Sequence, residues 1–172
     1  MKKILSVAIA LGFAQQFAFA DEPVAQGVKS TVQIKANTQQ VWDAVHHERS
    51  VDPDLSYSKV IEQKGSRILL EQKFNSIPVV GDATCLLVQE ETLLKRIDYK
   101  MVKSDKFKEM FGSWTLEEKP GGITALSLHS VLDTGLPFSQ GMVNTTLKGK
   151  IDKRLERVKV AAEAVALKSQ KP

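Results

Sequence analysis

Apolar and polar residues alternate with a period of two through the middle of the chain, from Tyr57 to Asp133. This alternation is typical of strands that bury one face. Glycine, proline and charged pairs interrupt it at short intervals, as in the turn 119–122, so the pattern predicts an antiparallel meander. The predicted strands are Val28–Ala36, Ser58–Gln63, Arg67–Phe74, Ala83–Gln89, Leu93–Val102, Phe107–Glu118 and Ile123–Leu132.

The segments before and after this meander have the residue patterns of helices. Asn37 is a typical N-cap residue, and Gln40 three positions later completes a capping box. The turn 52–54 ends that region. Near the C-terminus, apolar residues recur every three or four positions and predict one amphipathic helix of about 25 residues. They are Met142 or Val143, Leu147, Ile151, Leu155, Val158, Ala162 and Val165.

The first twenty residues have the order of a secretory signal peptide. Lys2 and Lys3 precede an apolar run, and small residues at Ala18 and Ala20 come before a charged pair. The sequence therefore predicts a leader over 1–20, export across the inner membrane to the periplasm, and one mature domain over 21–172. The apolar run is shorter than a bilayer span.

Composition narrows the class of protein. The 172 residues hold 24 Lys and Arg against 20 Asp and Glu, and no basic stripe interleaved with aromatics, so we expect no nucleic-acid partner. Cys85 is the single cysteine, which excludes an internal disulfide. The mature domain must be held by core packing, and we expect a monomer.

Three segments carry a resemblance to a known family. They are Ile34–Trp42, Phe111–Glu117, and the ending formed by Leu136-Pro137 and Leu155–Glu163. In this order the chain resembles the START/Bet v 1-like helix-grip (SRPBCC) superfamily, most closely the polyketide cyclase/dehydrase and coenzyme Q-binding-like branch. The resemblance implies an α+β fold: a curved antiparallel sheet of six or seven strands wrapped round a long C-terminal helix, with two short helices after the first strand. It also implies a cavity for sterols, lipids, quinones or polyketides.

Side-chain parity selects the residues that would line such a cavity. Tyr99 is the most informative, because its phenol could hydrogen-bond a ligand carbonyl or hydroxyl. Trp114 is predicted at the cavity floor or in the core, and Met142 near the mouth. The full predicted set is Tyr99, Met101, Met110, Trp114, Leu126, Leu128, Met142 and Leu147.

Other candidate chemistry is weaker. His46 and His47 are adjacent on a helix and cannot chelate one metal as an i, i+4 pair, so neither a metal nor a cofactor is expected. Cys85 is expected to be a buried structural thiol. His129 is predicted opposite the leucine face of its strand, where it is either a partly exposed histidine or a general base. Arg96 and Asp98 are expected to point outward as charged partners.

These features favour an exported, non-enzymatic carrier for a hydrophobic small molecule or lipid. The alternative is a cyclase/dehydratase-type enzyme with Tyr99 or His129 as acid or base, and a third hypothesis is an interaction protein with a filled core. Basic residues on the C-terminal helix could also make transient contact with a membrane surface. They are Lys148, Lys150, Lys153, Arg154, Arg157 and Lys159.

Overall fold

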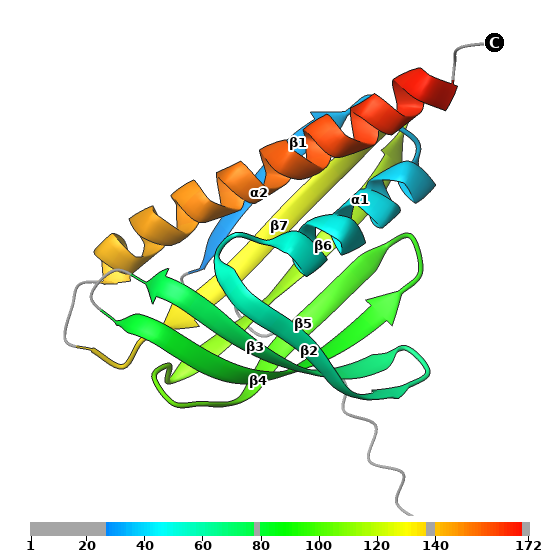
Figure 1. Cartoon of the computed structure of the whole chain (residues 1–172). Coiled ribbons are helices and arrows are strands. Elements are labelled where there is room, and N and C mark those ends of the chain that lie inside the picture. Colours follow the sequence, from blue (N-terminus) through cyan, green and yellow to red (C-terminus); the bar gives the residue numbers. More distant parts are fainter. Residues whose placement is uncertain (1–26, 78–79, 137–139, 170–172) are drawn as a thin grey trace, which may run out of the picture.

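The computed structural model describes residues 27–77, 80–136 and 140–169. One curved antiparallel sheet of seven strands carries two helices on one face, and the longer helix runs the length of the sheet (Figure 1). The α+β class and the long C-terminal helix are confirmed, and the strand number is seven. The expected leader and Pro137 lie outside the described residues.

The sheet has the strand order β1-β7-β6-β5-β4-β3-β2. Strands β2 to β7 each pair with their neighbour in sequence, while β1 pairs with β7 across the whole domain. The strands are β1 (Val28–Ile34), β2 (Leu55–Lys64), β3 (Arg67–Ile77), β4 (Gly81–Thr92), β5 (Arg96–Ser104), β6 (Glu109–Lys119) and β7 (Ile123–Asp133).

Strand boundaries differ from the prediction chiefly before β5. That strand begins at Arg96 instead of Leu93, because the chain turns through residues 92–95 and Leu94 has a φ of 60°. β1 ends at Ile34, two residues early, since the chain bends at Lys35 before the helix cap. β2 and β4 are longer than predicted, because a hairpin ladder continues pairing past the last alternating apolar residue.

A single helix, α1 (Thr38–Val51), follows β1, so the expectation of two short helices is wrong. The Asn37 side chain accepts a hydrogen bond from the Gln40 backbone N–H at 2.9 Å, and the Gln40 side chain accepts one from the Asn37 N–H at 3.1 Å. This capping box begins one uninterrupted helix of 14 residues. Only residues 52–54 separate it from β2, which leaves no room for a second helix.

The C-terminal helix, α2 (Gln140–Ser169), is longer than predicted, at 30 residues. Leu147, Ile151, Leu155, Val158 and Ala162 are buried as predicted. Val165 is instead 50% exposed, and Ala166 takes the buried position. A true α-helical period of 3.6 carries the contact stripe past Val165 in the last turns.

Side chains between helices and sheet form two apolar clusters. The first lies under α1 and α2 and includes Trp42, Ile97, Trp114 and Leu126. The second lies between β3, β4 and the β5–β6 connection and includes Leu70, Cys85 and Phe107. Tyr99 and Leu132 pack against both clusters, so they mark the boundary where the interior is least filled.

Candidate functional site

A cavity of about 170 Å³ lies between the sheet and α2, where the two apolar clusters meet. Its wall is mainly apolar and comes from β2 to β7, from the end of α1 and from the first half of α2. Leu70, Phe74, Leu87, Met110, Leu132 and Ile151 are among its lining residues. Such a wall suits a hydrophobic ligand, because apolar surface gains free energy by leaving water.

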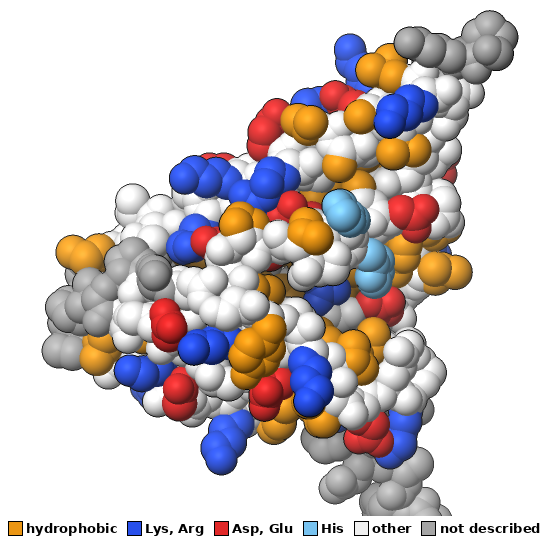
Figure 2. Space-filling model, viewed as in Figure 1, with side chains coloured by type: hydrophobic (Ala, Val, Ile, Leu, Met, Phe, Trp, Pro, Cys, Tyr) orange, Lys and Arg blue, Asp and Glu red, His pale blue; other side chains and the backbone are white. Residues whose placement is uncertain are grey.

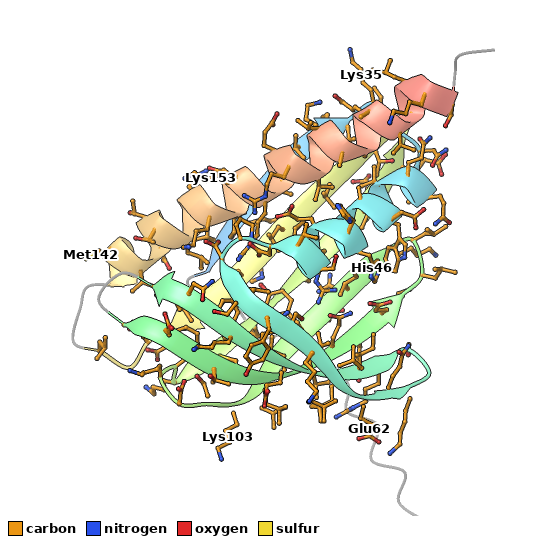
Figure 3. All side chains as sticks on the ribbon, in the orientation of Figure 1. Lys35, His46, Glu62, Lys103, Met142 and Lys153 are labelled. Atoms are coloured by element: carbon orange, nitrogen blue, oxygen red, sulfur yellow. The ribbon has the colours of Figure 1, made fainter. Side chains whose placement is uncertain are left out.

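The cavity opens toward the start of α2. Met142 and Leu136 both line it, yet they are 57% and 40% exposed. Figure 3 shows Met142 at the first turn of α2. Ile77, the last residue of β3, and Val80, just before β4, also line the cavity. An apolar ligand would therefore enter past an apolar rim.

Ion pairs join α1 to α2 along one side of the cavity. Arg154 Nε donates to Asp52 Oδ2 at 2.7 Å, and an Arg154 Nη donates to Asp54 Oδ2 at 3.1 Å. Lys150 Nζ lies 2.5 Å from Asp54 Oδ1, and Arg157 Nε donates to Glu48 Oε1 at 2.7 Å. Figure 2 shows acidic and basic side chains gathered along this seam between the helices.

The seam favours the ionised form of the Asp54 carboxylate. Burial acts to raise the pKa of Asp54, but the hydrogen bond from Lys150 and the charges of Arg154 and Arg157 leave that pKa below its ordinary value. Glu48 and Asp52 are buried as well. Because each carboxylate of the seam has a cationic partner on α2, this wall is polar and already neutralised.

Arg49 also lines the cavity, and it belongs to a different set of contacts. Its guanidinium donates to the side-chain oxygen of Gln89 on β4, and the Gln89 amide donates in turn to Glu91. Gln89 is 2% exposed, whereas Glu91 does not line the cavity. Burial lowers the pKa of Arg49 from its ordinary value, although an arginine stays charged at neutral pH.

Tyr99 reaches the same region of the cavity from β5. Its hydroxyl donates to the His129 carbonyl at 3.4 Å and is hydrogen-bonded by Ser130, another lining residue. Burial raises the pKa of the Tyr99 phenol, against the opposing effects of Ser130, Arg154 and Arg49. The phenol is therefore a neutral donor beside a fixed positive charge.

Gly112 creates the space for this phenol. A Cβ at Gly112 would lie 2.4 Å from Tyr99 Oη and 2.2 Å from the His129 carbonyl oxygen. Tyr99 pairs directly with Gly112 across the β5–β6 ladder. The absent side chain lets the ring lie flat over β6, so that its hydroxyl reaches β7.

Six of the eight predicted residues line the cavity: Tyr99, Met110, Trp114, Leu128, Met142 and Leu147. Leu126 and Met101 do not. Leu126 is fully buried in the first cluster, and Met101 packs into the second cluster next to an irregularity in the β4–β5 ladder. Parity identifies the face of a strand but not the position along it at which the cavity begins and ends. That any of these residues contacts a ligand stays a prediction.

Sequence reasoning missed Arg49 and the seam. Val41, Val45 and Arg49 follow one another at intervals of four, so the arginine continues the apolar stripe of α1. Glu48 and Asp52 lie on the same stripe at the next helical intervals. Charged residues in a buried stripe were the signal that could have located this part of the site.

His129 does not line the cavity. Leu128 and Ser130 do, so the His129 side chain lies on the opposite face of β7, where it pairs with Lys29 of β1. Its Nε2 is buried and has no hydrogen-bond partner among the described residues, and a Cβ at Gly27 would lie 2.6 Å from it. The structure therefore separates His129 from any ligand in the cavity.

The remaining candidates lie where the sequence indicated. Cys85 is fully buried, and burial raises the pKa of its thiol. Arg96 and Asp98 pair with each other on the outer face at 2.7 Å. His46 stacks on Trp42 with ring centroids 5.1 Å apart, while His47 is exposed. Figure 3 shows His46 on α1, and Lys103 and Glu62 pointing away from the helices.

Most of the basic side chains on α2 form ion pairs with carboxylates. Five of its six cations contact carboxylates: Lys148, Lys150, Arg154, Arg157 and Lys159. Lys153 is exposed on the helix (Figure 3). Lys150, Arg154 and Arg157 form the seam, because acidic residues of α1 and of the turn after it lie opposite them.

The described residues hold no group of three or more His, Cys, Asp or Glu side chains that could bind a metal ion. Within 27–77, 80–136 and 140–169, no helix is long and apolar enough to cross a membrane.

The sheet, the long helix and the cavity between them define a START-like domain. The chain belongs to the polyketide cyclase/dehydrase and lipid transport family, whose sequence model matches residues 25–163. No curated protein matches the chain significantly by sequence.

Solved structures agree on the fold. A protein of Thermus thermophilus is 16% identical with a TM-score of 0.62, over 84% of this chain and 99% of that one. The Zhui aromatase/cyclase of a Streptomyces species is also 16% identical with a TM-score of 0.62, over 80% and 93%. A START superfamily protein of Mycobacterium smegmatis is 14% identical with a TM-score of 0.61, over 84% and 99%. At these identities the likeness concerns the fold.

Proposed function

We propose that this protein is a binding or carrier protein for a hydrophobic small molecule or lipid, which it holds between the sheet and α2. The observation that carries the proposal is the apolar cavity with an exposed apolar rim at Met142 and Leu136. Burying an apolar ligand releases about 25 cal/mol for each Å² removed from water, so even a small lipid chain would be held. The family's description, which includes lipid transport, supports the same function.

The proposed compartment, the periplasm, is supported by the sequence alone. The order of basic, apolar and small residues over 1–20 supports export to the periplasm and cleavage after Ala20. A lipid carrier is useful in such an aqueous compartment, because its cargo is insoluble there. Cell fractionation, followed by N-terminal sequencing of the mature protein, tests this part: a mature N-terminus at Asp21 supports it, and an uncleaved cytoplasmic chain contradicts it.

Native mass spectrometry of the protein purified from its own host tests the carrier function. A stoichiometric hydrophobic adduct, identified after solvent extraction, is the expected result. A clean unliganded mass, together with no thermal stabilisation by a panel of lipids and quinones, would contradict the proposal. Stabilisation is the right second measurement, because a ligand that binds only the folded state raises the melting temperature.

One arrangement favours a second candidate function, a cyclase/dehydratase-type enzyme. Tyr99 and Arg49 both line the cavity and act on each other electrostatically, so the cavity holds a neutral phenol and a cation that could stabilise a developing oxyanion. One of the similar solved structures is an aromatase/cyclase. Turnover of an aromatic polyketide precursor, lost in Tyr99→Phe while ligand binding persists, would favour the enzyme; binding without turnover favours the carrier.

A further inference from the structure

One wall of the cavity contains a buried, uncharged amide. Gln72 lies at the centre of β3, lines the cavity and is 7% exposed. Leu70 and Phe74, two positions to either side on the same face of the strand, also line the cavity and are apolar. In these surroundings the amide has lost its hydrogen bonds to water, so each of its polar atoms needs a partner in the protein or in a ligand.

One end of this amide has such a partner. Gln72 Nε2 donates to Ser58 Oγ on β2 at 3.0 Å. Cys85 pairs with Gln72 from β4, but its thiol donates to Ser104 Oγ at 3.3 Å. Within the described part of the chain, Gln72 Oε1 accepts no hydrogen bond. It is also not one of the fully enclosed polar atoms that lack a partner, so it is accessible from the cavity that the side chain lines.

Asn75 repeats this arrangement nearer the end of β3. It lines the cavity, and its side-chain oxygen accepts a hydrogen bond from the Ser56 hydroxyl. Two exposed serines of β2 thus hold two amides of β3 by one end each. The carboxylates of the lining, by contrast, are paired with cations of α2, so the amides are better placed to bind a polar group of a ligand.

We propose that the ligand of this cavity is an apolar molecule with a hydroxyl group, an alcohol or a phenol, and that Gln72 selects it. This inference rests on the proposed binding function and specifies the class of ligand. The hydroxyl donates to Gln72 Oε1, while the apolar body lies against Leu70, Phe74 and Met110. A hydroxyl is a small donor without charge, whereas an ammonium group would need a carboxylate that is not already paired. A ligand without a donor leaves the buried oxygen unpaired.

Dodecanol and its methyl ether test this selection, because a methyl group replaces the hydroxyl proton in the ether. Each is titrated as a monomer into the mature protein by calorimetry. We expect dodecanol to bind about twofold to tenfold more tightly, the range for one net hydrogen bond. Without that bond the ether, which has the larger apolar surface, should bind more tightly. Equal binding, or tighter binding of the ether, overturns the hydroxyl inference alone. No binding of either probe overturns the proposed binding of lipid-like molecules as well.

Variants separate a role in binding from a role in folding. Gln72→Leu removes the acceptor and keeps a side chain of similar size. It should lower the ratio of dodecanol affinity to ether affinity by about twofold to tenfold and leave ether binding in place, whereas loss of a purely structural amide would weaken both ligands equally. Gln63→Leu is the matched control, since Gln63 is exposed on β2 outside the cavity, and it should keep the wild-type ratio. An unchanged ratio in Gln72→Leu overturns the inference, and the wild-type ratio tests it even if that variant fails to fold.

Discussion

At the scale of single residues, Gly112 has the clearest structural role. It lies opposite Tyr99 in the β5–β6 ladder, and any side chain there would occupy the place of the phenol. The Tyr99 ring and the backbone of β7 therefore occupy the space that a side chain at position 112 would need. Because glycine has no side chain, Gly112 is required both for the site and for the sheet.

Gly112→Ala is expected to destabilise the protein by about 1–3 kcal/mol, because its Cβ would overlap backbone as well as Tyr99. Gly149→Ala in α2 is the matched control. No atom lies within 4 Å of the added Cβ there, so the helix should gain about 0.5–1 kcal/mol. Urea unfolding measures both variants. An unchanged free energy of unfolding in Gly112→Ala would show that the Tyr99 ring can adopt another position.

His129 predicts a pH dependence. Burial lowers its pKa from 6.5, and the charges of Lys29 and Arg96 lower it further. The unfolded chain then takes up a proton at a higher pH than the folded protein, so the free energy of unfolding decreases as the pH falls from about 6.5 through the folded-state pKa. His129→Gln should reduce that slope in urea unfolding series between about pH 7.5 and pH 5.

The exposed His47 provides the control for this series. His47→Gln makes the same replacement at an exposed position. His46, whose pKa burial also lowers, should retain a residual slope in the His129 variant. If the free energy of unfolding fell equally with decreasing pH in wild type and in His129→Gln, the prediction would be contradicted. His129 would then titrate alike in the folded and unfolded chains.

At the scale of elements, most of the sheet could be predicted from the sequence. Period-two runs and turn residues located all seven strands, since each hairpin is specified by its own local residues. The number of helices could not be found that way. Nothing between Asn37 and Val51 breaks a helix, and the second short helix came from resemblance to a family instead of from these residues.

The seam was missed for a physical reason. Arg154 and Asp52 are far apart in sequence, and each alone has the composition of a solvated helix surface. Only the contact between α1 and α2 turns them into a buried pair, at 16% and 8% exposure. Long-range pairing of charges leaves no periodic signal in one chain, whereas burial of apolar residues does.

Arg154→Met tests how strongly the seam joins the helices. It leaves Asp52 buried with a weaker partner, so we expect a loss of about 3 kcal/mol in the free energy of unfolding. Lys148→Met breaks the exposed pair with Asp152 on the same helix and should cost less than about 0.5 kcal/mol. Equal effects in urea unfolding would show that the seam is no stronger than a surface pair.

At the scale of the whole molecule, we expect that a larger side chain can fill the cavity while the domain stays folded. Leu132 lines it where the two clusters meet, so Leu132→Trp should fill the space and abolish ligand binding while thermal unfolding stays cooperative. Val102→Trp, at a 59% exposed position outside the lining, should bind as wild type does. Dodecanol titration measures both, and undiminished binding in Leu132→Trp would place the ligand elsewhere.

The pairing of β1 with β7 has a consequence for the order in which the molecule assembles. Val28 pairs with Ser130, so the first strand has no partner until the last strand has been synthesised. The six strands from β2 to β7 can form as successive hairpins, each closing a short loop. Residues at the N-terminal end therefore join the sheet last, and completion of the domain coincides with arrival of its C-terminal third.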